Sequence, residues 1–545
     1  MPSAGRGLAG FALIWLALIG LVPLARLAAE AAGASWPPLL ADPAVWRAAR
    51  WSLLVALGAA GTATLLGGAM AAGLLLRAPP GRGLMLFLCI LPLLVPPQIM
   101  ALGWIQAGGP ASPLLLALDL APPIGTPNPI YGPAGMILLL GVQGAPLVLL
   151  AVAALLRRVP GELVAAAQSL GATPRAALSR TVWPLLVPGL LAGAGLAYVA
   201  ALGNFGVGLL IGVPARITVL PVLIWQRLSG AGAAGLEQAA MLAVILGILA
   251  APALLAQAMA ARRAAQPGRQ PFRPLPAGRL GLPIGLAIGS YLTLVLLVPI
   301  AALTAAALVP AMGMELSGAT ITSRHFAAAL SPGAHTGAAF ANSLILSGGA
   351  ALILAATALP LALAMRQGLV RRAGLVADLP YALPGAITGV AAILVVLALP
   401  FGMAVYGTLG LILFAYLTRF QALALRPAAA TAARLDPMLD AAAQSLGAGG
   451  WMRLMRVHLP PMAPALAAGG ILVALTAVNE VTVSSLLYGP GTQTLGVLVF
   501  GLQESGQGPL AAAVSCLALL LVAALMVLAS LVGRRLPAGT LPWRP

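Results

Sequence analysis

Residues 165–172 read AAAQSLGA, and residues 441–448 read AAAQSLGA again. The second copy begins 276 positions after the first, because 441 minus 165 is 276. The same offset then joins further matched pairs without a gap: Arg180 and Arg456, Pro184 and Pro460, Gly193 and Gly469. An identical octapeptide followed by a run of matched positions indicates an internal repeat. The chain is therefore predicted to be a tandem duplication of one structural unit.

The composition around these repeats is that of a membrane protein. Of the 545 residues, 61% are hydrophobic and 7% are charged, whereas a soluble domain carries about 25% charged residues. Apolar runs of about 20 residues recur, and each is long enough to cross a bilayer as a helix. We therefore predict an all-α membrane protein with about twelve transmembrane helices in two tandem-repeated six-helix lobes. The expected spans are 8–28, 53–76, 84–105, 134–156, 185–211 and 237–260, then 283–309, 342–365, 379–399, 405–425, 463–488 and 509–532.

The arginines predict the orientation. The chain contains no Lys, and its 29 basic residues are all Arg. With the N-terminus inside, 23 of them, Arg419 included, fall on the cytoplasmic side, which fits the positive-inside rule. The six on the other side are Arg26, Arg47, Arg50, Arg216, Arg227 and Arg324. We therefore expect both termini in the cytoplasm and a first helix that is retained, although that run could also be a cleaved signal peptide. The arginines do not cluster with aromatic residues, which argues against a nucleic-acid surface.

The residue inventory argues against an enzyme. Without Lys, the chain cannot form a standard Walker A loop, so any ATP hydrolysis must come from another polypeptide. Cys89 and Cys516 lie in separate apolar runs and are expected to be packing residues. The three His residues lack the spacing of a metal or nucleophile site. We therefore predict no catalytic residue and no metal site.

A linker is expected between the lobes. Residues 261–282 read ARRAAQPGRQPFRPLPAGRLGL and contain no apolar run. This predicts a first lobe at 1–265, a cytoplasmic linker at 266–282 and a second lobe at 283–545. The first repeated loop (159–184) and the second repeated loop (435–460) follow the fourth span of their lobes on the Arg-rich side. In both, a helix-favouring stretch precedes a glycine suited to a helix C-cap, so each is predicted to be a helical knob in the cytoplasm.

The pattern A-A-x-x-L-G, followed by W-P or L-P, resembles the EAA loop of binding-protein-dependent ABC permeases. In that family the loop forms a coupling helix that sits in a groove of a cytoplasmic ATPase. The resemblance implies this role for Ala166, Ala167, Gln168, Ser169, Leu170, Gly171, Pro184, Ala442, Ala443, Gln444, Ser445, Leu446, Gly447 and Pro460. The family's acidic position is occupied by Ala165 and Ala441, with Glu162 and Asp440 nearby.

The resemblance extends over nearly the whole chain and implies a fused permease of the iron(III) and thiamine branch, with the type I importer fold. The NEVTVSSLL stretch within 475–502 is most similar to iron(III) permeases. The expected solute is therefore iron(III), with thiamine, phosphonate or polyamine as alternatives. The implied partners are membrane lipid, two copies of an ABC ATPase that uses ATP and Mg, and a periplasmic binding protein. The chain itself is expected to bind no cofactor and to lie in the bacterial inner membrane.

A translocation path is expected between the lobes. Glu480 lies in an apolar run, where a charge is costly, and the offset of 276 matches it to Asn204. Both are candidate path residues that could face the solute or each other, together with Thr482 and Ser484; a local hydrogen-bonding role for Glu480 is the alternative. Corresponding prolines in the two halves are expected to break or kink their helices: Pro92, Pro96, Pro97, Pro380 and Pro384. A twelve-helix transporter driven by an ion gradient is the competing hypothesis, but it does not explain the repeated loops.

Overall fold

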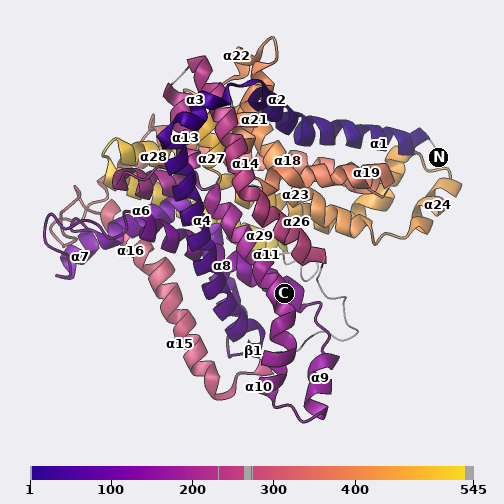
Figure 1. The fold of residues 1–545 in the computed structure, drawn as a ribbon, viewed down its shortest axis with the longest axis horizontal. Coiled ribbons are helices and arrows are strands. Elements are labelled where there is room, and N and C mark those ends of the chain that lie inside the picture. The colour runs from indigo at the N-terminus through magenta and orange to yellow at the C-terminus, as the bar shows by residue number, and fades with distance from the viewer. Residues whose placement is uncertain (1–2, 231, 263–271, 273, 367, 534–545) are drawn as a thin grey trace.

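The computed structural model describes residues 3–230, 232–262, 272, 274–366 and 368–533, and these are almost wholly helical (Figure 1). Part of the predicted linker, 266–271 and 273, therefore lies outside the described residues. The first half contains α1 Ser3–Leu16, α2 Val22–Gly33, α3 Trp36–Ala41, α4 Pro43–Met70, α5 Arg82–Leu94, α6 Pro97–Gly108, α7 Pro113–Ala117, α8 Pro133–Leu156, α9 Glu162–Ser169, α10 Pro174–Ala177, α11 Trp183–Leu202, α12 Phe205–Val207, α13 Leu220–Gly230 and α14 Gly232–Arg262.

The second half contains α15 Gly281–Leu292, α16 Val298–Ala307, α17 Arg324–Leu330, α18 His335–Ala364, α19 Gly368–Ala373, α20 Leu379–Ala382, α21 Gly385–Leu397, α22 Gly402–Val405, α23 Leu409–Ala432, α24 Pro437–Ser445, α25 Gly450–Arg453, α26 Leu459–Val478, α27 Thr482–Leu487, α28 Leu495–Glu504 and α29 Gly508–Gly533. The strands β1 (Arg77–Ala78) and β2 (Leu275–Pro276) pair in parallel, which ties the chain after α14 back to the first half.

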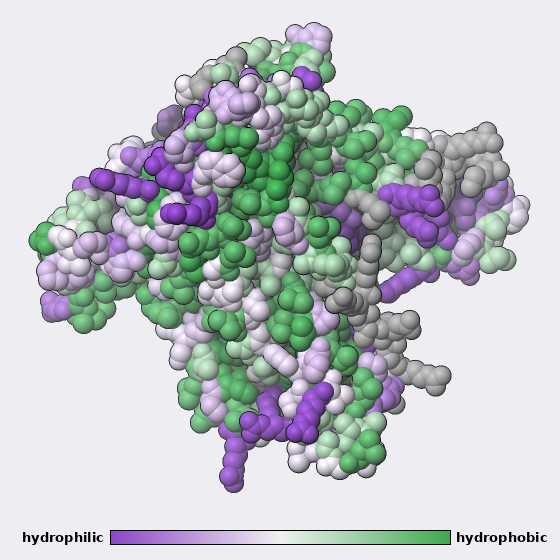
Figure 2. All heavy atoms as spheres, viewed as in Figure 1, coloured by the Kyte–Doolittle hydropathy of each residue, from purple (hydrophilic) through white to green (hydrophobic). Residues whose placement is uncertain are grey.

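The helices form a membrane protein, as predicted. The described residues contain 11 helices long and apolar enough to cross a bilayer, or up to 13 if each bent pair counts as one span. Hydrophobic residues cover much of the side of the helical body, and hydrophilic residues gather at its ends (Figure 2). Large apolar side chains exposed on the long helices include Leu57, Leu65, Leu286, Ile345, Leu352, Leu520 and Leu528. Such surfaces suit lipid rather than water.

Four of the predicted spans are not continuous helices. The expected span 84–105 is divided into α5 and α6, and 379–399 into α20 and α21, which are bent by 110°. The spans expected at 185–211 and 463–488 end at Leu202 and Val478, where α11 and α26 stop. Pro96 and Pro384 lie at two of these breaks, but Pro92 lies within α5, which continues to Leu94.

Each half has a three-helix centre built on the same close contacts. In the first half α4, α8 and α11 pack against one another, and in the second α18, α23 and α26 do so. A Cβ added to Gly193 of α11 would lie 2.5 Å from Val148 Cα, and one added to Gly469 of α26 would lie 2.9 Å from Ala424 Cα. These pairs are related by the offset of 276, so the duplication preserves a contact that only glycine allows.

The first spanning helix of each half packs on the other half. The first-half helix α2 contacts α21 as well as α14, and the second-half helix α16 contacts α6 as well as α29. A Cβ on Gly103 of α6 would lie 2.8 Å from the carbonyl oxygen of Pro299, at the start of α16. Figure 1 shows this packing of each half's first helices on the other half: α1 lies beside α18 and α19 at the right, and α15 lies beside the lower end of the first half.

Candidate functional sites: the repeated loops and the central helix breaks

The two repeated loops have the same backbone. After α9, the amides of Gly171 and Ala172 donate to the carbonyls of Gln168 and Ala167, both at 3.0 Å. After α24, the same two bonds form at the same distances: Gly447 to Gln444, and Ala448 to Ala443. This pattern closes a helix with a left-handed residue. Gly171 has φ +87° and Gly447 has φ +77°, so glycine suits both turns.

Each loop continues through a second short helix into a spanning helix. α10 follows the first glycine turn and α25 follows the second. Each is followed by one π-helical turn, Leu178–Val182 or Leu454–His458, that leads directly into α11 or α26. Pro184 and Pro460 are the second residues of those helices, directly after the π-helical turns, and as prolines they donate no amide hydrogen back to that turn. The expected order of helix, glycine turn and helix is present in both loops.

A leucine projects from each loop. Leu170 is 89% exposed and Leu446 is 86% exposed, although both belong to the verbatim repeat. Ala166, Gln168 and Ser169 are exposed as well, as are their counterparts Ala442, Gln444 and Ser445. Ala167 and Ala443 are half-buried on the inner side of their helices. α9 lies at the lower end of the molecule and α24 at its right end (Figure 1), so the two apolar surfaces are separate.

An ion pair lies at the centre of the molecule. Arg419 of α23 donates from Nε to Glu480 Oε2 at 3.0 Å, and the side chains are only 18% and 9% exposed. Arg419 Nη1 also donates to the carbonyl of Leu383, next to the bend between α20 and α21, at 3.2 Å. A Cβ on Gly385 would lie 3.1 Å from the Arg419 guanidinium carbon, so glycine makes room for the charge. The arginine thus joins three elements of the second half.

The predicted path residues Glu480 and Asn204 cap corresponding helices. Glu480 Oε1 accepts from the Val483 amide at 3.0 Å, and Asn204 Oδ1 accepts from the Val207 amide at 2.9 Å. Both acceptors follow a break and satisfy the start of a short helix, α27 or α12. Among the described residues, no hydrogen bond joins Asn204 to Glu480. The geometry therefore gives the two residues a local capping role.

The other predicted path residues lie close by. Ser484 is buried, and its hydroxyl lies 2.8 Å from that of Tyr416 and 2.9 Å from the Glu480 carbonyl. Thr482 lies where the halves meet, with its hydroxyl 3.5 Å from the carbonyl of Gly203. The four predicted residues are therefore near the centre, but only Thr482 makes a polar contact across the halves.

All four helix breaks meet between the two halves. The Asn479 side chain donates to the carbonyl of Leu94 at 2.9 Å, which joins the break after α26 to the one after α5. A Cβ on Gly203, after α11, would lie 2.9 Å from Pro384 Cβ, before α21. The crevice beside Gln98 and Asn479 holds only about 10 Å³, room for about one water. The halves are thus closely packed at this level.

Arg419 was placed wrongly from the sequence. It was counted with the cytoplasmic arginines, but it lies within α23 and its partner is a buried carboxylate. Two signals could have found it. Arg419 falls inside the expected span 405–425, and an intramembrane charge requires a partner. The offset of 276 also matches it to Gln143, so a polar residue occupies the same position of an apolar span in both halves.

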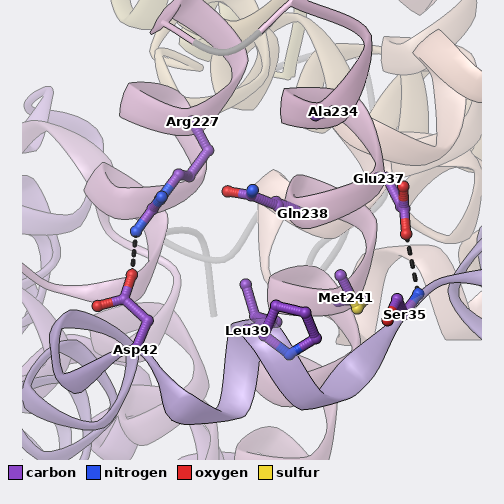
Figure 3. A pocket seen from close by; sticks show the side chains of 9 residues that line it. Ser35, Leu39, Asp42, Arg227, Ala234, Glu237, Gln238 and Met241 are labelled. Carbon is purple, nitrogen blue, oxygen red and sulfur yellow. Dashed lines mark hydrogen bonds and ion pairs between the residues drawn. The ribbon is translucent and has the colours of Figure 1, made fainter.

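A half-open pocket with charged residues in its lining lies between α3, α13 and α14 (Figure 3). Its volume is about 250 Å³. Arg227 pairs with Asp42 on one side, and Glu237 accepts from the Ser35 amide at 2.9 Å on the other. Gln238 points between them, and its Oε1 has no partner within the described part of the chain. The charged side chains that line this pocket already have partners within the chain, so they hold α3 and α4 against α13 and α14.

The chain matches known transport proteins over most of its length. Residues 63–266 and residues 356–538 each match the family described as binding-protein-dependent transport system inner membrane component. A probable ABC transporter permease protein of Sinorhizobium fredii is 27% identical over 515 residues, which cover 91% of this chain and 89% of that protein.

Relatives of several named types match parts of the chain. The thiamine transport system permease protein of Brucella suis is 30% identical over 232 residues, 42% of this chain and 41% of that protein. A probable molybdenum ABC transporter permease protein of Haloferax volcanii is 28% identical over 255 residues, 47% of this chain and 90% of that protein. The two family matches lie one in each half, as the duplication predicts. The chain therefore belongs to the binding-protein-dependent transport system inner membrane components, and it is a fused, two-domain ABC importer permease rather than an enzyme.

Proposed function

We propose that this chain forms the complete membrane path of its importer and binds two ATPase subunits, one on each repeated loop. The observation that carries the proposal is the paired helix, glycine turn and helix with an exposed leucine at two separate ends of the molecule. A periplasmic binding protein delivers the solute, and the ATPase subunits use ATP and Mg. Both termini lie in the cytoplasm, and this chain binds no cofactor.

The connection between loops and centre supports alternating access. α11 runs from the first repeated loop to the break before Asn204, and α26 runs from the second repeated loop to the break before Glu480. Each helix has 20 residues, or about 30 Å at 1.5 Å per residue. A displacement of either loop by an ATPase is therefore carried along one continuous helix to the break at the centre. Rocking of the two halves about this level opens and closes the path.

We propose iron(III) as the solute, on the sequence resemblance of the 475–502 stretch. The Glu480 carboxylate does not add to this proposal, because Arg419 already neutralises it. Relatives named for thiamine, molybdenum and 2-aminoethylphosphonate make these solutes alternatives, and the sequence resemblance leaves polyamine as a further one. Uptake of labelled iron(III) and of each alternative, compared between cells with and without this chain, decides among them. Loss of thiamine uptake with unchanged iron uptake would replace iron(III).

Photo-cross-linking tests the docking proposal in its native setting. Benzoylphenylalanine placed at Ser169 or at Ser445 is expected to cross-link to a P-loop ATPase that mass spectrometry identifies. The double variant Leu170→Asp, Leu446→Asp is expected to lose that ATPase on purification. Burying a leucine is worth about 2 kcal/mol, so each loop should lose roughly thirtyfold in affinity. Both leucines are already exposed, so the permease itself should stay folded.

A matched control separates docking from general damage. Leu120 and Ile124 are also highly exposed, but they precede α8, whereas the first repeated loop follows it. The double variant Leu120→Asp, Ile124→Asp should therefore keep the ATPase. If no ATPase associates with the unaltered chain, the proposal that the repeated loops bind two ATPase subunits is wrong.

A further inference from the structure

The two helices within each repeated loop are held together by a different kind of contact in the two loops. In the second, Asp440 of α24 accepts from Arg453 Nη1 at 3.1 Å and lies 3.0 Å from His458 Nε2. Subtracting 276 gives the three corresponding positions in the first loop: Val164, Ala177 and Val182. Ala177 and Val182 are buried, and Val164 packs on the same apolar cluster as Val182. The first repeated loop is therefore closed by apolar contacts and the second by charges.

The exposed surfaces of the two repeated loops also differ, but here the second loop is the more apolar one. In the second repeated loop, Trp451 is 72% exposed, Met438 is 69% exposed and Met452 is also exposed. The corresponding residues of the first repeated loop are Arg175, Glu162 and Ala176. Arg175 and Glu162 are exposed as well. The second loop thus adds three large apolar side chains to its leucine, where the first has a cation, a carboxylate and a methyl group.

From this exchange we infer that the two ATPase docking surfaces are unequal: the second repeated loop is an apolar anchor, and the first is a contact that depends on charge. The inference rests on the proposed function and adds to it an order of binding. A partner that covers Met438, Trp451 and Met452 removes apolar area from water, which salt does not weaken. A partner of the first loop must instead meet the exposed guanidinium of Arg175, and exposed charges are screened by salt.

Salt therefore separates the two docking events. Between about 0.1 M and 1 M salt the Debye length falls from about 10 Å to about 3 Å. We expect binding at the first repeated loop to weaken about fivefold over this range, the size of one lost surface ion pair. Binding at the second repeated loop should change less than about twofold, because apolar burial dominates there. At high salt the complex then carries one ATPase, on the second loop.

The experiment reports on each loop separately. The ATPase identified by cross-linking is purified without nucleotide, to prevent pairing of its subunits, and titrated onto the purified full chain. The chain carries benzoylphenylalanine at Ser169 or at Ser445, and cross-linked product is measured at 0.1 M and 1 M NaCl. Two exchange variants provide matched controls. Met438→Glu, Trp451→Arg, Met452→Ala gives the second loop the first loop's surface, and Glu162→Met, Arg175→Trp, Ala176→Met does the reverse.

The expected result is salt-sensitive cross-linking at Ser169 and salt-resistant cross-linking at Ser445, with both behaviours exchanged by the two variants. Equal salt responses at the two positions, or variants that leave them unchanged, overturn the inference while the docking proposal stands. Absence of ATPase cross-links at both positions in 0.1 M NaCl overturns the proposed function itself.

Discussion

At the residue scale, Arg419 and Glu480 form the one charged pair of the central packing described above. A buried ion pair adds little net stability, because desolvation of the two charges offsets their attraction. Removal of one partner is costly, because it leaves the other charge buried and unpaired. The corresponding neutral residues in the first half, Gln143 and Asn204, indicate which replacement the surrounding fold accepts. The pair therefore matters for how the second half is held together at the bend beside Leu383.

Glu480→Gln is expected to destabilise the protein, because Arg419 loses its carboxylate. The expected cost is about 3 kcal/mol, measured as a lower unfolding temperature in detergent. The double variant Arg419→Gln, Glu480→Asn copies the first half and should recover all but about 1 kcal/mol, since the introduced asparagine can still cap α27. If the double variant were less stable than Glu480→Gln alone, the unpaired Arg419 charge would not be the cause of the destabilisation, and the prediction would be wrong.

At the element scale, the rigidity of each repeated loop depends on the contact between its two short helices. In the second loop that contact is the triad of Asp440, Arg453 and His458, which joins α24 to the turn leading into α26. A charge-assisted bond between a partly exposed carboxylate and a largely buried donor contributes about 1 kcal/mol. A loop that loses this bond should open more often while the rest of the half remains folded.

Asp440→Ala is expected to loosen the second repeated loop alone. Hydrogen exchange at amides 438–448 should become about fivefold faster, which corresponds to about 1 kcal/mol of local opening. Amides 162–172 of the first repeated loop, in the same sample, are the internal control and should not change. The triple variant Asp440→Val, Arg453→Ala, His458→Val copies the first loop's apolar contact and should restore slow exchange. Unchanged exchange in Asp440→Ala would mean that the triad does not hold α24.

At the scale of the whole molecule, the two halves are interlocked. α2 of the first half packs on α21, and α16 of the second packs on α6. The side chain of Asn479 and the carbonyl of Leu94 add a polar contact at the centre. Each half therefore buries apolar surface on the other at its edges as well as between the central breaks, and separation exposes all of it.

Two polypeptides, 1–266 and 267–545, are expected to co-purify from one membrane without a covalent link, because the exchanged helices hold them together. Deletion of residues 1–33 from the first polypeptide should weaken this association, since it removes the helices that reach α18 and α21. The measurement is the fraction of the second polypeptide recovered with a tag on the first. Complete separation of the intact halves in mild detergent would contradict the interlocked arrangement.

The amino-acid sequence by itself determined the properties that depend on residues near one another or on exact repetition. Apolar runs require helices in a bilayer wherever they occur, so the membrane class and the approximate spans followed from hydropathy. The octapeptide at 165–172 and 441–448 gave the duplication and the site of both loops, and Gly171 and Gly447 end their helices through local backbone preference.

Only the tertiary structure decided which distant residues meet. The breaks after Leu202 and Val478 escaped detection because apolar sequence resumes directly after the polar residues that stand at them, Asn204 and Asn479-Glu480, so averaged hydropathy does not distinguish a break from a longer helix. Arg419 and Glu480 are 61 residues apart, and their pairing depends on how α23 packs beside the end of α26. The exchange of α2 and α16 between halves has no local signal at all, because any apolar helix face suits any other until packing selects one.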